Sequence, residues 1–594
     1  MKRHARALAL LCALLAARAS ASLHCAMRRE ISPCTCRREE SSTGSILVVC
    51  QRITAYQDIA RALTNKFSPE TKIGLDISYS ELPDFADHSF RELGLSIRKL
   101  KLNYDNLSDL QESAFSKLDL VDFLSLADNS LTEMPKHVLR QLPHVKTLDV
   151  CRNNITKLAE DDVREEVENL LLAGNQISKI DKHAMPKALK HIHLGINKLT
   201  RLNGALRDLD NLEWVFINAN QLKTIEGELP TKARKMYLIH AASNELQSLP
   251  KDLRQLPSLK SLYFYHNNIK SLDGAIQKSR KLDLLSLSFN KIVSLAEDDF
   301  AETEILQNLD LAYNQLQSLN GSLRNLKSLR YLNLTHNYLT EFSLEEIKGL
   351  RRLGVLDLSH NKIAQITGNL ENLVNVETKV MELRLDHNNI VSLGSALMGL
   401  HGLMKLNLSN NLLQQMAPED LVGLQNLKVL DISFNQIISL EGTAKTFLPS
   451  LEELYAHHNN LSRLDKDFQG LPSLCKADMA FNNIQTVSED LLSKSSCTID
   501  GVRSILNVYL QDNPVLCDER IYELEKWNAR VSGTARCSSG TTTAPSLLRT
   551  LNDGAPPVRV AQLLPPNAVG VVVKWPDERR PHPLADHLRL RRPQ

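Results

Sequence analysis

The nonapeptide YLNLTHNYL, from Tyr331 to Leu339, combines a strand pattern with a polar residue in an apolar setting. Leu332 and Leu334 alternate with their neighbours as on one buried face of a β-strand. Asn337 then occupies a place where a third buried leucine would be expected. A side-chain amide both donates and accepts hydrogen bonds, so a buried turn can use it to satisfy backbone groups that water does not reach. We expect replacement of Asn337 by leucine to cost about 1 to 3 kcal/mol.

The same pattern recurs along the chain at a regular spacing. Aligned on the asparagine, nineteen units have key positions at 80, 105, 129, 153, 175, 197, 220, 244, 267, 290, 314, 337, 361, 388, 411, 435, 459, 482 and 513. Their mean spacing of about 24 residues falls within the 20 to 29 residues of leucine-rich repeats. Ser80 and Asp105 replace the asparagine in the first two units. One such unit cannot bury its leucines alone, so the units must stack on one another.

From Cys25 to Cys537 the chain resembles an extracellular leucine-rich-repeat protein of animals, most closely the secreted or surface-attached arthropod members of the connectin and chaoptin kind. The resemblance implies an α/β fold, a curved leucine-rich-repeat solenoid with a parallel sheet on its concave face and disulfide-bonded caps. Strands stacked about 4.8 Å apart would make this sheet about 85 Å long. A long concave surface is therefore the dominant feature that we expect.

The first 21 residues predict a secretory signal peptide. Lys2, Arg3 and Arg6 precede an apolar run, and residues 19–21 are small, as signal peptidase requires. The alternative is an uncleaved membrane anchor, but the apolar run over 7–17 is too short to cross about 30 Å of hydrocarbon. No later segment has 18 uninterrupted apolar residues, and the chain ends in the basic HLRLRRPQ. We expect a secreted protein without a transmembrane segment.

Four further segments follow from the pattern: an N-terminal cysteine cap over 22–72, the repeats over 73–513, a C-terminal cap over 514–538, and a Pro- and Arg-rich tail over 539–594 that we expect to be disordered. At the first cap, the resemblance implies that Cys25 pairs with Cys36 and Cys34 with Cys50. Metal binding by Cys34 and Cys36 is the alternative, but secretion favours oxidation.

The stretch NPVLCDERIYELEKW resembles a C-terminal cap motif, although Glu519 stands where a second cysteine is expected. We expect Cys517 to pair with Cys537, and Cys475 with Cys497 between neighbouring turns. Cys151 is then left over as either a free thiol or an intermolecular bridge, and the free thiol is the simpler interpretation.

Charge and motifs argue against several functions. Lys and Arg number 71 and Asp and Glu number 69. The resulting net charge of +2 is far from the dense positive field that nonspecific binding of nucleic acid needs. No phosphate-binding loop, zinc-protease helix or serine-nucleophile turn appears in a suitable context. We therefore expect no enzyme activity and no cofactor.

The position just before the key asparagine forms a column of ring side chains along the stacked units, and its histidines could suggest a metal site. His336, His360 and His387 each immediately precede a key asparagine, and Phe289, Tyr313, Phe434 and Phe481 fill the same position elsewhere. Zinc needs ligands that converge at about 2.0 to 2.1 Å, whereas a ladder spreads them apart. We interpret the column as a repeat position that accommodates rings and predict no metal site.

Aromatic residues gather on the inner face of units five to eight. Residues six, four and two before the asparagine share that face because side chains alternate along a strand. The candidate ligand-binding residues are His191, His193, Trp214, Phe216, His240, Tyr263 and Tyr265. Aromatics flanked by polar groups are typical anchors of protein interfaces. The alternative is that sheets simply favour aromatic residues. A smaller candidate group is Tyr455, His457 and His458.

Six sequons predict glycosylation in a secreted chain, at Asn106, Asn154, Asn320, Asn333, Asn407 and Asn460. Asn333 and Asn407 should project onto the inner curve, where sugars would shield the C-terminal half of the sheet. The sequence thus favours recognition of an extracellular protein by a rigid concave surface, in cell adhesion or matrix organisation. Innate immune recognition of microbial ligands and a noncatalytic subunit of a secreted enzyme are the alternatives, and homodimerisation stays open.

Overall fold

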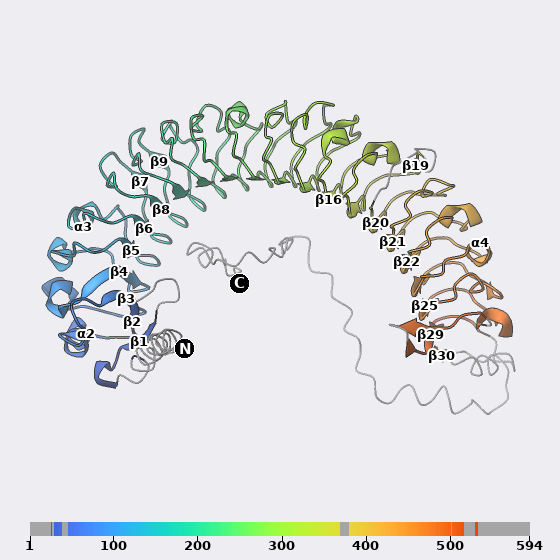
Figure 1. Ribbon diagram of the computed structural model, residues 1–594, viewed down its shortest axis with the longest axis horizontal. Coiled ribbons are helices and arrows are strands. Elements are labelled where there is room, and N and C mark those ends of the chain that lie inside the picture. The colour runs from blue at the N-terminus through green and yellow to red at the C-terminus, as the bar shows by residue number, and fades with distance from the viewer. Residues whose placement is uncertain are drawn as a thin grey trace, which may run out of the picture.

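The computed structural model describes residues 25, 29–38, 45–368, 379–492, 494–499, 502–515 and 529–532. These form an open arc of stacked coils with a 22-stranded sheet on its inner curve (Figure 1). The predicted signal peptide, Cys517, Cys537 and the tail lie outside the described residues. Within them, no helix is long and apolar enough to cross a membrane.

Every strand of the main sheet is parallel to its neighbours except β1, which is antiparallel to β2. Nineteen of the 22 strands precede the nineteen key positions, while β1, β2 and β30 flank them. The predicted solenoid with its parallel concave sheet is thus confirmed. The strands are β1 (Thr35–Arg38), β2 (Ile46–Gln51), β3 (Lys72–Ser78), β4 (Ser96–Asn103), β5 (Phe123–Ser125), β6 (Thr147–Asp149), β8 (Asn169–Leu171), β10 (His191–His193), β11 (Trp214–Phe216), β12 (Leu238–His240), β13 (Ser261–Tyr263), β14 (Leu284–Ser286), β15 (Asn308–Asp310), β16 (Tyr331–Asn333), β18 (Val355–Asp357), β20 (Glu382–Arg384), β21 (Lys405–Asn407), β22 (Val429–Asp431), β23 (Glu453–Tyr455), β25 (Lys476–Asp478), β29 (Leu506–Tyr509) and β30 (Ala529–Ser532).

The returns on the outer side contain little regular structure. Two-stranded pairs join β7 (Lys157–Leu158) to β9 (Lys179–Ile180), β17 (Glu341–Ser343) to β19 (Gln365–Thr367), β24 (Arg463–Leu464) to β26 (Thr486–Val487) and β27 (Thr498–Ile499) to β28 (Val502–Arg503). The helical part of the α/β fold is small in the described residues. It consists of the short helices α2 (Tyr56–Leu63), α3 (Lys136–Arg140) and α4 (Glu441–Lys445) and the 3-10 turns η1 (Arg29–Ile31), η2 (Phe85–Asp87), η3 (Phe90–Leu93), η4 (Glu112–Phe115), η5 (Lys251–Gln255), η6 (Ser322–Asn325), η7 (Leu344–Ile347), η8 (Pro418–Leu421) and η9 (Glu489–Leu492).

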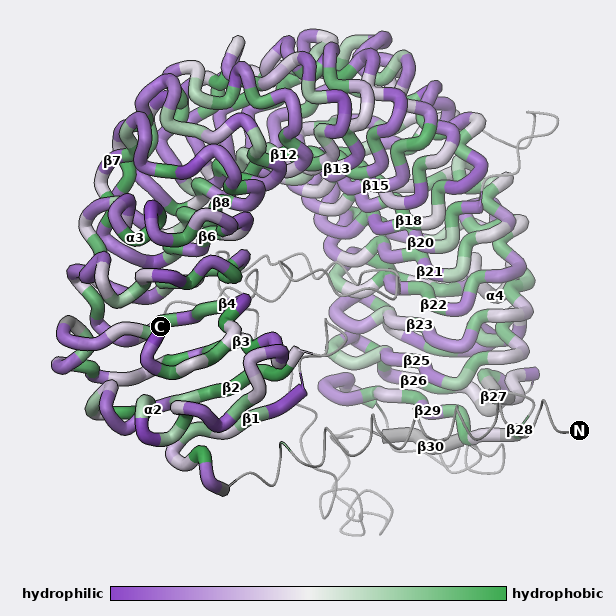
Figure 2. Tube along the Cα trace, turned by 60° about the vertical axis from the view of Figure 1, so that its left-hand side comes forward, coloured by the Kyte–Doolittle hydropathy of each residue, from purple (hydrophilic) through white to green (hydrophobic). Residues whose placement is uncertain are grey.

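The core runs through the interior of the coils. Leu332 is fully buried in β16 between the half-buried Tyr331 and Asn333, and its register places it beside the central leucines of β15 and β18. Hydrophobic and hydrophilic segments alternate within each coil (Figure 2). Each coil therefore buries its apolar residues against the coils on either side, as a repeat protein must.

The key asparagines form a continuous hydrogen-bonded ladder. Asn337 Nδ2 donates to the carbonyl oxygens of Leu311 and Leu334, each at 3.0 Å, and its Oδ1 accepts from the Leu316 amide at 3.0 Å. Two of these three contacts reach the preceding coil. The predicted role of the buried amide is confirmed.

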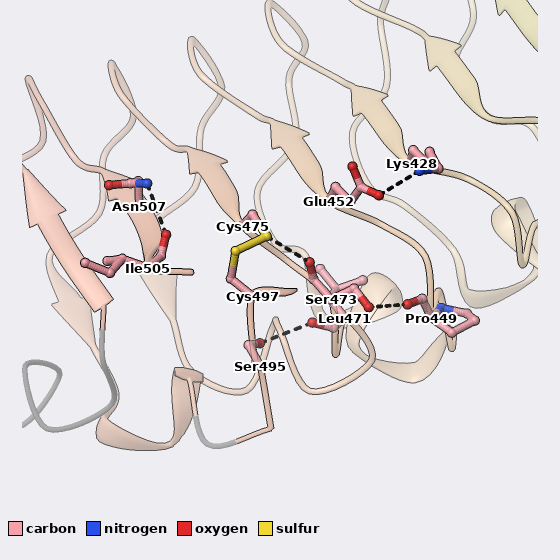
Figure 3. The surroundings of a disulfide bond; sticks show 10 residues. All are labelled: Lys428, Pro449, Glu452, Leu471, Ser473, Cys475, Ser495, Cys497, Ile505 and Asn507. Carbon is pink, nitrogen blue, oxygen red and sulfur yellow. Dashed lines mark hydrogen bonds and ion pairs between the residues drawn. A yellow bond between two sulfur atoms is a disulfide. The ribbon is translucent and has the colours of Figure 1, made fainter. Parts of the chain in front are cut away.

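Disulfides close both ends of the described array. Cys25 bonds to Cys36 and Cys34 to Cys50, which is the pairing that the resemblance implied. Cys475, just before β25, bonds to Cys497, just before β27, and so joins two neighbouring coils (Figure 3). Cys151 is a free and buried thiol.

Candidate functional site

The seven predicted ligand-binding residues lie side by side on the concave face. Six are in β10 to β13, and Tyr265 lies two residues after the end of β13. The central residues Ile192, Val215, Ile239 and Leu262 are fully buried, so the residues on either side of them face the concavity. All seven side chains are half-buried, which leaves part of each ring accessible.

The rings of these residues contact one another across four strands. His191 lies 4.5 Å from Trp214 between ring centroids. A second row runs from His193 to Phe216 at 5.1 Å and from Phe216 to His240 at 5.8 Å. It continues from His240 to Tyr263 at 5.3 Å, and His240 Nε2 lies 3.2 Å from the Tyr265 hydroxyl. We call this set of seven residues the ring wall. Contact between its members fixes their orientation before any ligand arrives.

Beside the ring wall the concave face is hollowed. The hollow measures about 110 Å³ and is lined by five members of the ring wall, all but Tyr263 and Tyr265. Small or aliphatic residues complete the lining. They belong to a buried cluster separate from the main core, Ala127, Cys151, Leu171 and Ala173, of which all but Ala127 line the hollow. The lining thus combines large rings, four to six residues before their key asparagines, with the small Cys151 and Ala173 two residues before theirs.

The rim beside the hollow carries one paired charge. Arg152 Nε and Nη2 donate to the two carboxylate oxygens of Asp128 at 2.5 and 2.6 Å. Burial and the neighbouring Asp149 raise the pKa of the Cys151 thiol well above its usual range. The thiol is therefore neutral at pH 7, which makes it a poor nucleophile.

The histidine in the middle of the ring wall is also neutral at pH 7. Burial, and secondarily the nearby His193, lower the pKa of His240 to about 4. Burial raises the pKa of Tyr263 and of Tyr265. Because an uncompensated charge is costly to bury, this lining suits neutral groups.

The structure adds a polar atom that the sequence interpretation missed. Asn218 lines the hollow, and its Oδ1 is buried and accepts no hydrogen bond from any residue that the structure describes. A Cβ on Gly195 would lie 2.6 Å from this oxygen and 3.0 Å from His193 Nε2, so glycine is needed for the close approach. The sequence held one signal for this atom. In four successive units the residue two positions before the key asparagine is small, and in the next unit that position is Asn218.

The smaller candidate group is held by internal contacts. The Tyr455 hydroxyl donates to Glu453 at 2.6 Å, and Lys476 Nζ lies 4.4 Å from the Tyr455 ring centroid. His457 and His458 approach through their Nδ1 atoms at 2.9 Å. The hollow that the structure shows lies beside the ring wall, so the candidate site is placed there.

The column of residues before the key asparagines is a stack of rings. Six successive rings, from His266 to His387, lie 4.0 to 4.1 Å apart between centroids. Phe434, His458 and Phe481 form a second stack at 4.2 and 4.4 Å. All nine residues have φ near +54°, which points their side chains along one edge of the sheet. The predicted ring-accommodating position is confirmed.

This stack also bears on metal binding. His360, Asp386 and His387 offer ligand atoms within 4.8 Å of one another. The two imidazole planes are 16° apart, so their in-plane lone pairs run side by side and do not converge on one ion. His387 Nδ1 instead lies 3.1 Å from an Asp386 oxygen. The geometry suits ring stacking better than coordination.

The sequons divide into two groups. Asn106, Asn154, Asn320 and Asn460 are exposed and lie outside the strands. Asn333 and Asn407 are half-buried on concave strands, where their Oδ1 atoms accept from the amides of Thr335 at 3.1 Å and Ser409 at 3.0 Å. These two asparagines therefore also stabilise the turn after the strand, a role that a sequon does not reveal.

The chain belongs to the leucine rich repeat family. The model of that family matches residues 95–155, 165–222, 234–292, 280–339, 304–363, 378–437 and 425–484. Among named proteins, the chain is 29% identical to lumican of Rattus norvegicus over 147 residues, which are 24% of this chain and 43% of lumican. It is 37% identical to fibromodulin of Sus scrofa over 106 residues, 17% of this chain and 69% of that sequence. The chain thus spans less than half the length of lumican.

Two solved structures have the same fold. The Toll–Spatzle complex of Drosophila gives a TM-score of 0.62 at 19% identity, covering 88% of this chain and 77% of that chain. A leucine-rich-repeat protein of Leptospira interrogans gives a TM-score of 0.51 at 24% identity, covering 70% and 97%. At these identities the two structures show the solenoid architecture alone.

Proposed function

We propose that this chain is a secreted, non-enzymatic protein that recognises an extracellular protein through the ring wall of its concave sheet, in cell adhesion or matrix organisation. One observation carries the proposal: seven rings lie in contact on adjacent strands of a preformed surface, and five of them line a neutral hollow. Aromatic side chains dominate the binding energy of protein interfaces, and a rigid scaffold loses little freedom on binding. The finer likeness to connectin- and chaoptin-type proteins is part of this proposal.

Further support comes from features typical of secreted proteins. The chain begins with a signal-like segment and carries three disulfides among its described residues. Toll, a solenoid of the same architecture, was determined in complex with the protein Spatzle. A concave solenoid of this kind is therefore compatible with a protein ligand.

The test is a capture experiment on secreted extracellular proteins. A Trp214→Ala, Tyr263→Ala double variant should bind the captured partner at least about 30-fold more weakly, because a hot-spot aromatic contributes about 2 kcal/mol or more. The matched control is Tyr331→Ala, Tyr509→Ala, which removes rings from the same two repeat positions elsewhere on the sheet. Equal capture by the wild type and the first double variant would contradict the proposal.

The same experiment separates the alternatives. Aggregation of cells by the purified protein would favour adhesion. Capture of a microbial polysaccharide would favour immune recognition, and a co-purifying enzyme activity would favour a noncatalytic subunit.

Sugars on Asn333 and Asn407 would leave the ring wall as the open part of the concave face. We expect glycopeptide mapping of the secreted protein to find both sites occupied, together with the four exposed sequons. If both concave asparagines are unmodified, shielding gives no reason to prefer the N-terminal half of the sheet.

A further inference from the structure

We propose that one edge of the arc, at the start of the strands from β12 to β18, binds an extended sulfated polysaccharide. In these six coils the seven residues immediately before each strand contain fourteen bases and three acids, a net charge of +11. We call these bases the basic edge: Lys232, Arg234, Lys235, Arg254, Lys260, Lys278, Arg280, Lys281, Arg324, Lys327, Arg330, Lys348, Arg351 and Arg352. The inference goes beyond the proposed protein ligand and shares with it only the secreted location.

The positive charge is confined to this part of the molecule. The equivalent positions in the six preceding coils hold eight bases and ten acids, a net charge of −2. In the coils of the basic edge itself, the nine residues after each key asparagine hold four bases and nine acids, a net charge of −5. The whole-chain value of +2 therefore conceals a strong separation of charge across the middle of the arc.

The stacking of the coils arranges these bases in a row. The residues just before the strands continue the hydrogen bonding of the main sheet, with the Asp283 amide donating to the Lys260 carbonyl oxygen at 2.9 Å and the Arg330 amide to that of Gln307 at 2.8 Å. Five steps of about 4.8 Å make the row about 24 Å long. Its shape is that of an extended chain.

Most of the bases are available to a ligand. Four of the fourteen are in ion pairs, namely Arg280 with Glu302, Arg324 with Glu297, Lys327 with Glu304 and Lys348 with Glu345. The other ten are exposed and form no ion pair with any residue that the structure describes. A polyanion laid along such a row gains affinity from the small counterions that both partners release.

The basic edge is poorly suited to an acidic protein. Within its six segments, Tyr237 and Ile305 are the only exposed large hydrophobic side chains, and Lys260 Nζ lies 5.1 Å from the Tyr237 ring centroid. Protein interfaces depend on buried aromatic and aliphatic anchors, which this edge lacks. The ligand should therefore be recognised by its charge.

Chemistry and location select the kind of polyanion. Five of the ten unpaired bases are arginines, whose guanidinium groups donate paired hydrogen bonds to oxyanions. Single-stranded nucleic acid needs several exposed rings for base stacking, and anionic lipids belong to the cytoplasmic leaflet. For a secreted chain, the linear polyanion that carries such oxyanions is a sulfated polysaccharide.

The test measures the Kd of the full secreted chain for heparin by titration calorimetry in about 0.15 M NaCl and at rising salt. We expect Arg234→Gln, Lys281→Gln, Arg352→Gln to bind heparin at least about tenfold more weakly, because each base beside an anionic surface contributes a factor of about five. The plot of log K against log salt should also become shallower, by about one for each contact removed.

The matched control removes the same charge from beyond the other end of the strands. Lys251→Gln, Lys270→Gln, Lys291→Gln changes three bases that are also exposed. It should leave the heparin affinity within about twofold of the wild type. Both triple variants change exposed side chains only, so both should keep the wild-type Tm. Heparin stripped of its sulfates should bind the wild type at least about tenfold more weakly than heparin itself.

Unchanged heparin affinity in the first triple variant, or an equal loss in the second, would overturn the proposal. Duplex DNA or phosphatidylserine vesicles that bind as tightly as heparin would overturn it too, since the edge would then not select a sulfated polysaccharide. The Trp214→Ala, Tyr263→Ala variant should bind heparin as the wild type does. Failure of protein capture and failure of heparin binding are therefore separate results.

Discussion

At the scale of single residues, Asp105 is the clearest departure from the repeat pattern. Its Oδ1 accepts from the Ser80 amide at 2.9 Å, as an asparagine would, but its Oδ2 is buried without a donor among the described residues. Burial raises the pKa of Asp105 to about 7, with Asp76 adding to the effect and the Ser80 hydrogen bond opposing it. The folded state therefore favours the protonated carboxyl.

The consequence for stability follows from this raised pKa. The stabilisation from the protonated form is complete below the unfolded-state pKa of about 3.9 and is lost as the pH rises through about 7. We expect Asp105→Asn to stabilise the first repeats by about 1 to 3 kcal/mol at pH 8 and by much less at pH 5.

Hydrogen exchange of peptides covering residues 72–105 at the two pH values measures this difference. Asp119→Asn changes an exposed aspartate and serves as the control. An equal gain at pH 5 and pH 8 would show that the carboxyl is not protonated in the folded state.

At the scale of elements, the ring stack makes the middle of the arc sensitive to acid. Burial, and then the neighbouring His360 and His387, lower the pKa of His336 to about 4, although Asp357 opposes the shift. Burial and His387 likewise lower the pKa of His360, against Asp386 and Asp357. Since the folded state prefers neutral rings, their stabilisation is present above about pH 6.5 and is lost as the pH falls toward 4.

We expect hydrogen exchange in residues 308–388 to accelerate between pH 7 and pH 4.5, after correction for intrinsic rates. His336→Phe should reduce this acid response, because Phe289 shows that the repeat position accepts a phenylalanine ring. His144→Phe replaces an exposed histidine outside the stack and should leave the response unchanged. A response that is the same in all three proteins would rule out the stack as its source.

Sequence alone predicted the elements well because the repeat period sets both the strands and their register. Side chains alternate every two residues along a strand, and each key asparagine sets the starting point of that alternation. This was enough to predict that the amide of Asn337 is buried and that Trp214 faces the concave side. Local spacing does not determine how neighbouring units pack, however. The hollow depends on Ala173 and Cys151 lining the same space as rings one to four strands away, and the unmet oxygen of Asn218 lies under the closely approaching Gly195.

At the scale of the whole molecule, the arc presents two different halves of one continuous sheet. The ring wall and hollow occupy the strands from β6 to β13, while the strands from β15 to β25 carry mostly polar and charged residues and both concave sequons. The proposed function places the partner on the first half. The division explains how a regular repeat can carry one localised site.

Hydrogen-exchange mass spectrometry of the protein, alone and with its captured partner, tests this account most directly. We expect protection to concentrate in peptides spanning residues 169–265, with little change over residues 382–478. Protection confined to the outer returns, with no change in residues 169–265, would contradict recognition through the concave ring wall.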